Sequence, residues 1–204
     1  MIRLSDHIAA AGGWLSLEAF MQLALHHPQE GYYSSSIENI GQRGDFSTTP
    51  TLSPILAKAI VAHWKEACSR CGRRLPLLEI GAGSGALAVK ILERLGFWNR
   101  LNTDYVIVES SPRLREFQHL LLGGRAKIYS TMEKALKHCG GKAFIFSNEL
   151  VDAFPARVFE YTEQDWKEVG LVVKNGAVRE ELRPVRQQPL FSHMLEYGSQ
   201  PGQR

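Results

Sequence analysis

Three glycines and two carboxylates, placed where two apolar runs end, are the residues best suited to bind a small ligand. The stretch LLEIGAGSGALA passes from an apolar run through a glycine-rich turn into a helix-forming sequence. Its candidate ligand-contacting residues are Glu79, Gly81, Ala82, Gly83 and Gly85. Glycine lets the backbone approach a ligand closely. Glu109 and Ser110 follow the next apolar run, where a carboxylate can accept hydrogen bonds from two ribose hydroxyls.

The spacing of the glycines is G-x-G-x-G, whereas the dinucleotide fingerprint is G-x-G-x-x-G. With Glu79 before it and Glu109 after it, the turn resembles the first two motifs of class I S-adenosylmethionine methyltransferases. That cofactor carries no pyrophosphate for a helix N-terminus, but a sulfonium and an amino acid tail that suit glycines and a carboxylate. A nicotinamide cofactor, or a tight turn without a ligand, is the alternative.

The elements around this turn alternate between strand and helix, which is typical of a parallel sheet covered by helices on both faces. Ligands of such sheets bind at the carboxyl ends of the strands. The expected strands are 75–80, 104–108, 126–129 and 143–146, with a fifth at 157–161. The expected helices are 16–27, 53–70, 85–95, 111–122 and 132–138. Asn175-Gly176 predicts a hairpin between 169–174 and 177–182.

The composition favours a globular protein: the formal net charge is +3, which is too small to indicate a nucleic-acid partner. No apolar run approaches the roughly 18 residues of a membrane helix, so no membrane insertion is expected. The three cysteines fit a reducing compartment. Cys68 and Cys71 form a single C-x-x-C without a matching pair, and we expect no metal site. The expected location is the cytoplasm.

Several segments together resemble the MidA family, which includes a mitochondrial complex I assembly methyltransferase. In order along the chain these are SLEAFMQLALHHPQEGYY, GDFSTTPTLSP, LLEIGAGSGALA, YVIVESSPRLREFQ and SNELVDAFP. The resemblance implies a Rossmann-like class I methyltransferase that uses S-adenosyl-L-methionine and methylates an arginine of a protein substrate. In a eukaryote it would imply the mitochondrial matrix. By the same resemblance, Gly44 and Asp45 lie over the cofactor or the substrate entrance.

Asn148, Glu149 and Asp152 follow the expected fourth strand, beside the expected cofactor. A guanidinium is cationic, and a carboxylate can orient it and localise its charge. Glu149, supported by Asp152 and Asp45, is therefore the candidate catalytic group, and Asn148 a candidate cofactor contact. The alternatives are that Asp152 caps a short helix, that Glu149 closes a turn and that Asp45 caps a turn.

The expected domains are an N-terminal extension (1–74), a cofactor-binding core (75–165) and a hairpin with a C-terminal tail (166–204). MidA-like proteins are longer, so we expect the last strands of the sheet to be missing. An open edge would then be covered by a homodimer contact or another partner. The alternative function is a non-catalytic cofactor-binding or assembly module, or an inactive shortened methyltransferase.

Overall fold

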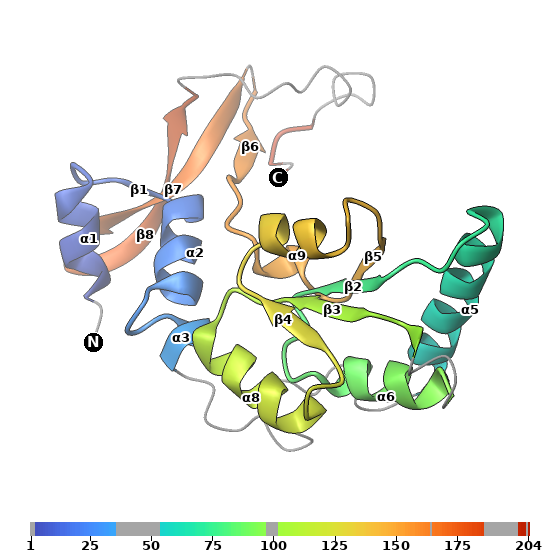
Figure 1. The fold of residues 1–204 in the computed structure, drawn as a ribbon. Coiled ribbons are helices and arrows are strands. Elements are labelled where there is room, and N and C mark those ends of the chain that lie inside the picture. The colour runs from blue at the N-terminus through green and yellow to red at the C-terminus, as the bar shows by residue number, and fades with distance from the viewer. Residues whose placement is uncertain (1–2, 36–53, 97–101, 164, 186–199, 203) are drawn as a thin grey trace. The chain divides into compact units, whose positions relative to one another are not determined.

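The computed structural model describes residues 3–35, 54–96, 102–163, 165–185, 200–202 and 204. Contacts divide the chain into two compact units, one of residues 1–32 with 153–204 and one of residues 33–152 (Figure 1). This division differs from the expected boundaries after residues 74 and 165. The reason is that residues far apart in sequence share one core in the first unit, which local patterns along the chain do not reveal.

The unit of residues 33–152 contains a parallel sheet, whose described strands have the order β4-β3-β2-β5. The strands are β2 (Leu77–Ile80), β3 (Tyr105–Val108), β4 (Lys127–Tyr129) and β5 (Phe144–Ser147). Leu77 is in register with Tyr105 on one side and with Phe144 on the other. All four residues of β3 are buried, as expected for a parallel strand covered on both faces. The predicted α/β fold class is confirmed.

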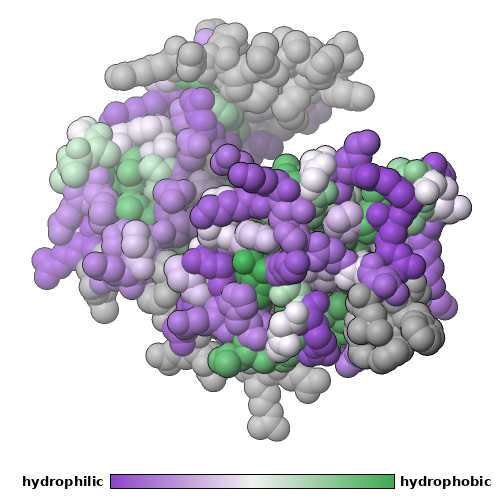
Figure 2. Space-filling view, in the orientation of Figure 1, coloured by the Kyte–Doolittle hydropathy of each residue, from purple (hydrophilic) through white to green (hydrophobic). Residues whose placement is uncertain are grey.

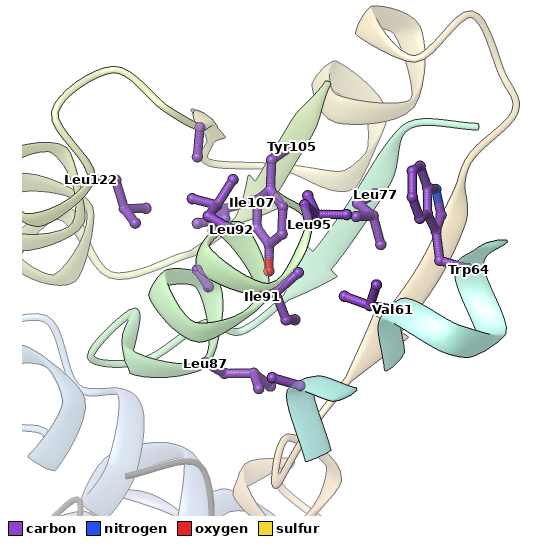
Figure 3. Close-up of a cluster of buried hydrophobic side chains, with 13 residues drawn as sticks. Val61, Trp64, Leu77, Leu87, Ile91, Leu92, Leu95, Tyr105, Ile107 and Leu122 are labelled. Atoms are coloured by element: carbon purple, nitrogen blue, oxygen red, sulfur yellow. The ribbon is translucent and has the colours of Figure 1, made fainter. Parts of the chain in front are cut away.

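Helices cover both faces of this sheet. They are α5 (Ile55–Arg70), α6 (Ala86–Arg94), α8 (Pro112–Leu122) and α9 (Met132–His138), accompanied by the shorter α3 (Tyr32–Ser35) and η1 (Val151–Ala153). On one face α5, α6 and α8 bury a cluster that includes Leu77 and Tyr105 (Figure 3). On the other face Ala135 of α9 packs with Leu78 and Val106.

The sequence explains the limits of these helices. Ser111 and Thr131 cap α8 and α9 by accepting hydrogen bonds from the third backbone N–H. On α5 the buried residues Ala57, Val61 and Trp64 recur at helical spacing. Pro54 takes the N-cap position of α5.

The other unit is built on an antiparallel sheet with two helices. Its elements are α1 (Leu4–Ala10), β1 (Leu15–Ser16), α2 (Leu17–His26), β6 (Phe159–Tyr161), β7 (Trp166–Lys174) and β8 (Ala177–Pro184). The predicted hairpin is confirmed as β7–β8, with Asn175 and Gly176 at φ 52° and 73°. Such a turn needs positive φ at both positions.

The expectation that residues 157–161 form a fifth strand of the parallel sheet is wrong. The segment forms β6, which pairs antiparallel with β7 in the other sheet. Only four residues separate Tyr161 from Trp166. A link this short can join antiparallel neighbours, whereas parallel strands need a crossover of a dozen residues or more.

The surface in Figure 2 is mostly hydrophilic, with small separate hydrophobic areas. Within the described part of the chain, no helix combines the length and the apolar character needed to span a membrane.

Candidate ligand-binding site

The sheet brings three candidate segments to one edge. In the parallel register, Ile80 of β2 lies opposite Val108 of β3 and Ser147 of β5. The residues that follow these strands are Gly81, Glu109 and Asn148. Because β2 lies between β3 and β5 in the sheet, the glycine turn lies between the acidic end of β3 and the polar segment after β5. This edge holds the carboxyl ends of the strands, where α/β sheets bind ligands.

Glycine is required in the turn for different reasons at different positions. Gly81 has φ 69°, and a Cβ there would lie 2.6 Å from Cδ1 of Leu150. Gly85 has φ 73° and is the N-cap of α6, where its N–H donates to the carbonyl of Ala82 (2.8 Å). Gly83 has φ 53°, but a Cβ there would meet no atom of the described residues within 4 Å. Among those residues, the backbone at Gly83 therefore borders open space.

Glu109 is a buried carboxylate at the end of β3, with 6% of its surface exposed. Its Oε1 accepts a hydrogen bond from the backbone N–H of Ser111 (3.0 Å). Its Oε2 lies 3.4 Å from the amide nitrogen of Gln118. Burial raises the pKa of Glu109, while hydrogen bonds from Ser111, Gln118 and the Gly83 backbone oppose the shift. Hydrogen-bond donors from the glycine turn and from α8 thus surround the Glu109 carboxylate.

The segment around Glu109 is itself tied down. Ser111 Oγ donates to the backbone carbonyl of Tyr33 (3.2 Å), which joins this segment to α3. The Arg115 guanidinium donates to the carbonyls of Glu109 (2.9 Å) and Ser110 (2.7 Å). The Ser110 residue is exposed beside this anchored backbone.

Glu79 lies inside β2, within the expected strand 75–80, because the strand continues to Ile80. It is 2% exposed. The Tyr105 hydroxyl donates to its Oε2 (2.7 Å). Burial raises the pKa of Glu79 to about 7; the Tyr105 hydrogen bond lowers it and the charge of Glu109 raises it. Glu79 is therefore placed as a buried partner of Tyr105, beneath the turn.

The segment after β5 presents exposed carboxylates. Glu149 has φ 49°, a left-handed conformation that is rare outside glycine and often found at functional sites. Glu149 and Asp152 are exposed, and Asn148 is half-buried. Neither carboxylate has a hydrogen-bond or ion-pair partner among the described residues. Asp152 lies within η1. Gly44 and Asp45 fall in 36–53, outside the described residues.

Gln118 was not identified from the sequence, although it contacts this site. It donates to the carbonyl of Gly83 (2.8 Å) as well as lying beside Glu109. The available signal was its position on α8, where Leu114, Gln118 and Leu122 are buried at four-residue spacing. A polar residue on a buried helical stripe has to find a polar partner.

The two cysteines of the C-x-x-C lie away from this edge of the sheet. Cys68 accepts a hydrogen bond from the backbone N–H of Leu75 (3.3 Å), and Cys71 is exposed. No cluster of three or more His, Cys, Asp or Glu side chains suited to a metal occurs within the described ranges.

The chain resembles known proteins along most of its length. A family model described as "Putative S-adenosyl-L-methionine-dependent methyltransferase" matches residues 55–204. The Xenopus tropicalis and Danio rerio proteins named protein arginine methyltransferase NDUFAF7, mitochondrial, are 26% and 28% identical over 192 and 193 residues. These alignments cover 80% of this chain, but 44% and 45% of the relatives. The chain thus spans about half the length of these curated relatives.

Solved structures agree with this assignment. A COG1565 superfamily member from Burkholderia thailandensis, bound to S-adenosyl-homocysteine, has a TM-score of 0.74 and 30% identity. The match covers 91% of this chain and 49% of that protein. A native structure of a COG1565 superfamily protein from the same organism has a TM-score of 0.71 and 30% identity, over 90% of this chain and 47% of that one. The family model, the sequence relatives and the fold agree: the chain belongs to the MidA-like family of S-adenosyl-L-methionine-dependent methyltransferases.

Proposed function

We propose that this chain binds S-adenosyl-L-methionine at the edge formed by the glycine turn, Glu109 and Asn148, and takes part in methyl transfer to an arginine of a protein substrate. The observation that carries the cofactor site is the buried carboxylate of Glu109 beside the open backbone of Gly83. The arginine acceptor is supported by the relatives named protein arginine methyltransferases.

The residues present fit this cofactor. A cradle is open at Gly83, where a side chain would fill space that a ligand can use. Glu109 offers carboxylate oxygens to ribose hydroxyls at the end of the neighbouring strand. Bound there, S-adenosyl-L-methionine would supply a methyl group on a sulfonium. Gly81, Ala82, Gly83 and Gly85 would line it with backbone, and Ser110, Asn148 and Gly44 would complete the proposed contacts. Glu79 would support the turn from beneath, as the buried partner of Tyr105.

For the acceptor, we assign the main role to Glu149. Its exposed carboxylate follows β5 and can accept a bidentate hydrogen bond from a guanidinium. This contact would orient the reacting nitrogen and localise the positive charge on the others. Asp152 and Asp45 would support it. Positioning of this kind is the main contribution that a protein makes when it assembles two reactants.

A protein substrate is the proposed partner, and neither nucleic acid nor membrane insertion is part of the proposal. The location proposed with it is the cytoplasm, or the mitochondrial matrix in a eukaryote, since the relatives are named mitochondrial. We also propose that a second copy or another partner covers the edge strand β5. Among the described strands β5 pairs with β2 alone, and Ile145 on β5 is 47% exposed. Light scattering after size-exclusion chromatography measures the oligomeric state. A monomeric mass would exclude a second copy as the partner that covers β5.

Calorimetric titration with S-adenosyl-homocysteine tests the cofactor site. We compare the wild type with Glu109→Ala, and use Glu116→Ala as the matched control because Glu116 is exposed on α8. Loss of a hydrogen bond to a charged group costs about 1.5–3 kcal/mol, which is about 10- to 100-fold in affinity. Glu109→Ala should show this loss and Glu116→Ala should not.

NAD is the control ligand in the same titration. Binding of NAD by the wild type, or no binding of S-adenosyl-homocysteine by a folded chain, would overturn the proposed site. Transfer of labelled methyl from S-adenosyl-L-methionine to protein arginine then tests the acceptor. Label in low-mass material instead would point to a small-molecule acceptor.

A further inference from the structure

Gln118 lies where helices usually place an apolar side chain. It is on the stripe of α8 that faces the sheet, between Leu114 and Leu122, and its exposed fraction is 0%. From there it reaches two different loops. Its side-chain nitrogen donates to the carbonyl of Gly83 (2.8 Å) and to Oε2 of Glu109 (3.4 Å). One amide group therefore joins the turn after β2 to the end of β3.

Packing alone does not explain why this buried position carries a glutamine. The Oε1 atom of Gln118 is buried and has no hydrogen-bond partner among the described residues. An unpaired buried amide oxygen is unfavourable, and an apolar side chain of similar shape would avoid it. The two hydrogen bonds from its nitrogen remain as the reason for an amide at this position.

We propose that Gln118 is a positioning residue, which holds the Gly83 backbone and the Glu109 carboxylate in the arrangement that receives the adenosine part of the cofactor. This inference rests on the proposed function. A carboxylate that is already oriented loses less conformational freedom when the ligand binds, and this raises affinity. Gln118 itself need not touch the ligand for this effect.

The charges near Glu109 determine how it responds to changes at Gln118. Glu79 is close enough for the two carboxyl groups to repel each other. The Arg115 guanidinium favours the charged form, as do hydrogen bonds from the Gly83 and Ser111 backbones. The Gln118 amide also lowers the pKa of Glu109. Removing this amide should therefore raise that pKa, even without ligand.

The test compares Gln118→Met and Gln118→Glu with the wild type, using S-adenosyl-homocysteine as the probe. Leu114→Met is the matched control, because Leu114 lies one turn away on the same buried stripe. Gln118→Met removes both hydrogen bonds and the unpaired oxygen while keeping the shape. We expect the Kd to rise about tenfold, the cost of one to two hydrogen bonds, with a Tm no lower than that of Leu114→Met.

Gln118→Glu places a second carboxyl group beside Glu109. At low pH one of the two is protonated and can donate to the other, as the amide does. At high pH both are charged and repel each other. The Kd of this variant should therefore rise with pH more steeply than that of the wild type, which checks that position 118 faces Glu109. The Gln118→Met measurements decide whether the amide has a role beyond packing.

A readout without ligand separates this inference from the proposed function. Carboxyl 13C NMR should show a higher pKa for Glu109 in Gln118→Met than in the wild type, and hydrogen exchange should be faster at Gly83 and Gly85. If the wild type binds no S-adenosyl-homocysteine, the proposed function fails, and with it the role of Gln118 in cofactor binding. The pKa of Glu109 and the exchange rates of the turn still decide whether Gln118 holds the turn. Unchanged pKa, exchange and Kd in Gln118→Met would overturn the inference.

Discussion

The hydroxyl of Tyr105 donates a 2.7 Å hydrogen bond to Glu79 across the neighbouring strands β2 and β3, and both side chains are buried. Tyr105 belongs to the buried cluster that α5 and α6 cover. Burial raises the pKa of both groups, that of Glu79 to about 7. At neutral pH the folded protein therefore contains a buried carboxyl group near its point of titration.

Glu79 makes stability depend on pH in a defined direction. Its pKa is raised in the folded state, so its contribution is fully present below about pH 4.5 and is lost as the pH rises through about 7. Glu79→Gln cannot ionise and should gain stability over the wild type between pH 5 and pH 8, by at most about 3 kcal/mol.

Hydrogen exchange of the β2 and β3 amides, measured at both pH values, gives the local stability for this comparison. Tyr105→Phe removes the hydrogen bond that lowers the pKa of Glu79 and should steepen the pH dependence. If the difference in stability between Glu79→Gln and the wild type were the same at pH 5 and pH 8, the raised pKa of Glu79 would be contradicted.

Gly81→Ala should cost more than Gly83→Ala, because the end of the Leu150 side chain must move to make room for the new Cβ. The left-handed alanine costs about 1–2 kcal/mol, and the shift of Leu150 adds about 1 kcal/mol. Gly83→Ala has a positive φ but open space, so it should show the first cost alone. Denaturant unfolding measures both, and Leu150→Ala should restore part of the loss in Gly81→Ala but none in Gly83→Ala.

In the other unit, Gly170 on β7 is predicted to be equally restricted. A Cβ at Gly170 would overlap the ring of Trp14, whose Nε1 donates to the carbonyl of Glu181 (3.2 Å). Gly170→Ala must displace this ring, at a cost of about 1–3 kcal/mol or more. Thermal unfolding with a probe in β7–β8 measures the loss. Gly170→Ala in a Trp14→Ala background should show a much smaller effect; an undiminished loss would implicate the backbone instead.

Glu149→Gln should impair methyl transfer without weakening cofactor binding. In the proposed arrangement this carboxylate makes a charged hydrogen bond to the acceptor, worth about 1.5–3 kcal/mol, or about 10- to 100-fold in kcat/KM. Asp152→Asn should have a smaller effect. The Kd for S-adenosyl-homocysteine should stay unchanged in both, and Glu163→Gln, an exposed carboxylate in the β6–β7 turn, is the control. A wild-type rate in Glu149→Gln would remove it from the proposed mechanism.

Local sequence patterns were sufficient to predict the parallel sheet and the edge that carries the candidate site. Apolar runs such as YVIV, each followed by a helix with a cap such as Ser111, fix local structure and strand direction. Strand direction in turn places Gly81, Glu109 and Asn148 at the same edge. These features are local, so composition and spacing were sufficient to find them.

Other features depend on how the elements pack, and local patterns could not predict them. An apolar segment does not specify its sheet: residues 159–161 pair with β7, in the antiparallel direction that the short link allows. Glu79 lies within its strand and accepts a hydrogen bond from Tyr105, which is 26 residues away in the chain. Gln118 reaches Gly83 and Glu109 from a third element. Hydrogen bonds between residues far apart in the chain form only when the elements pack, and they determine which polar residues the core can accept.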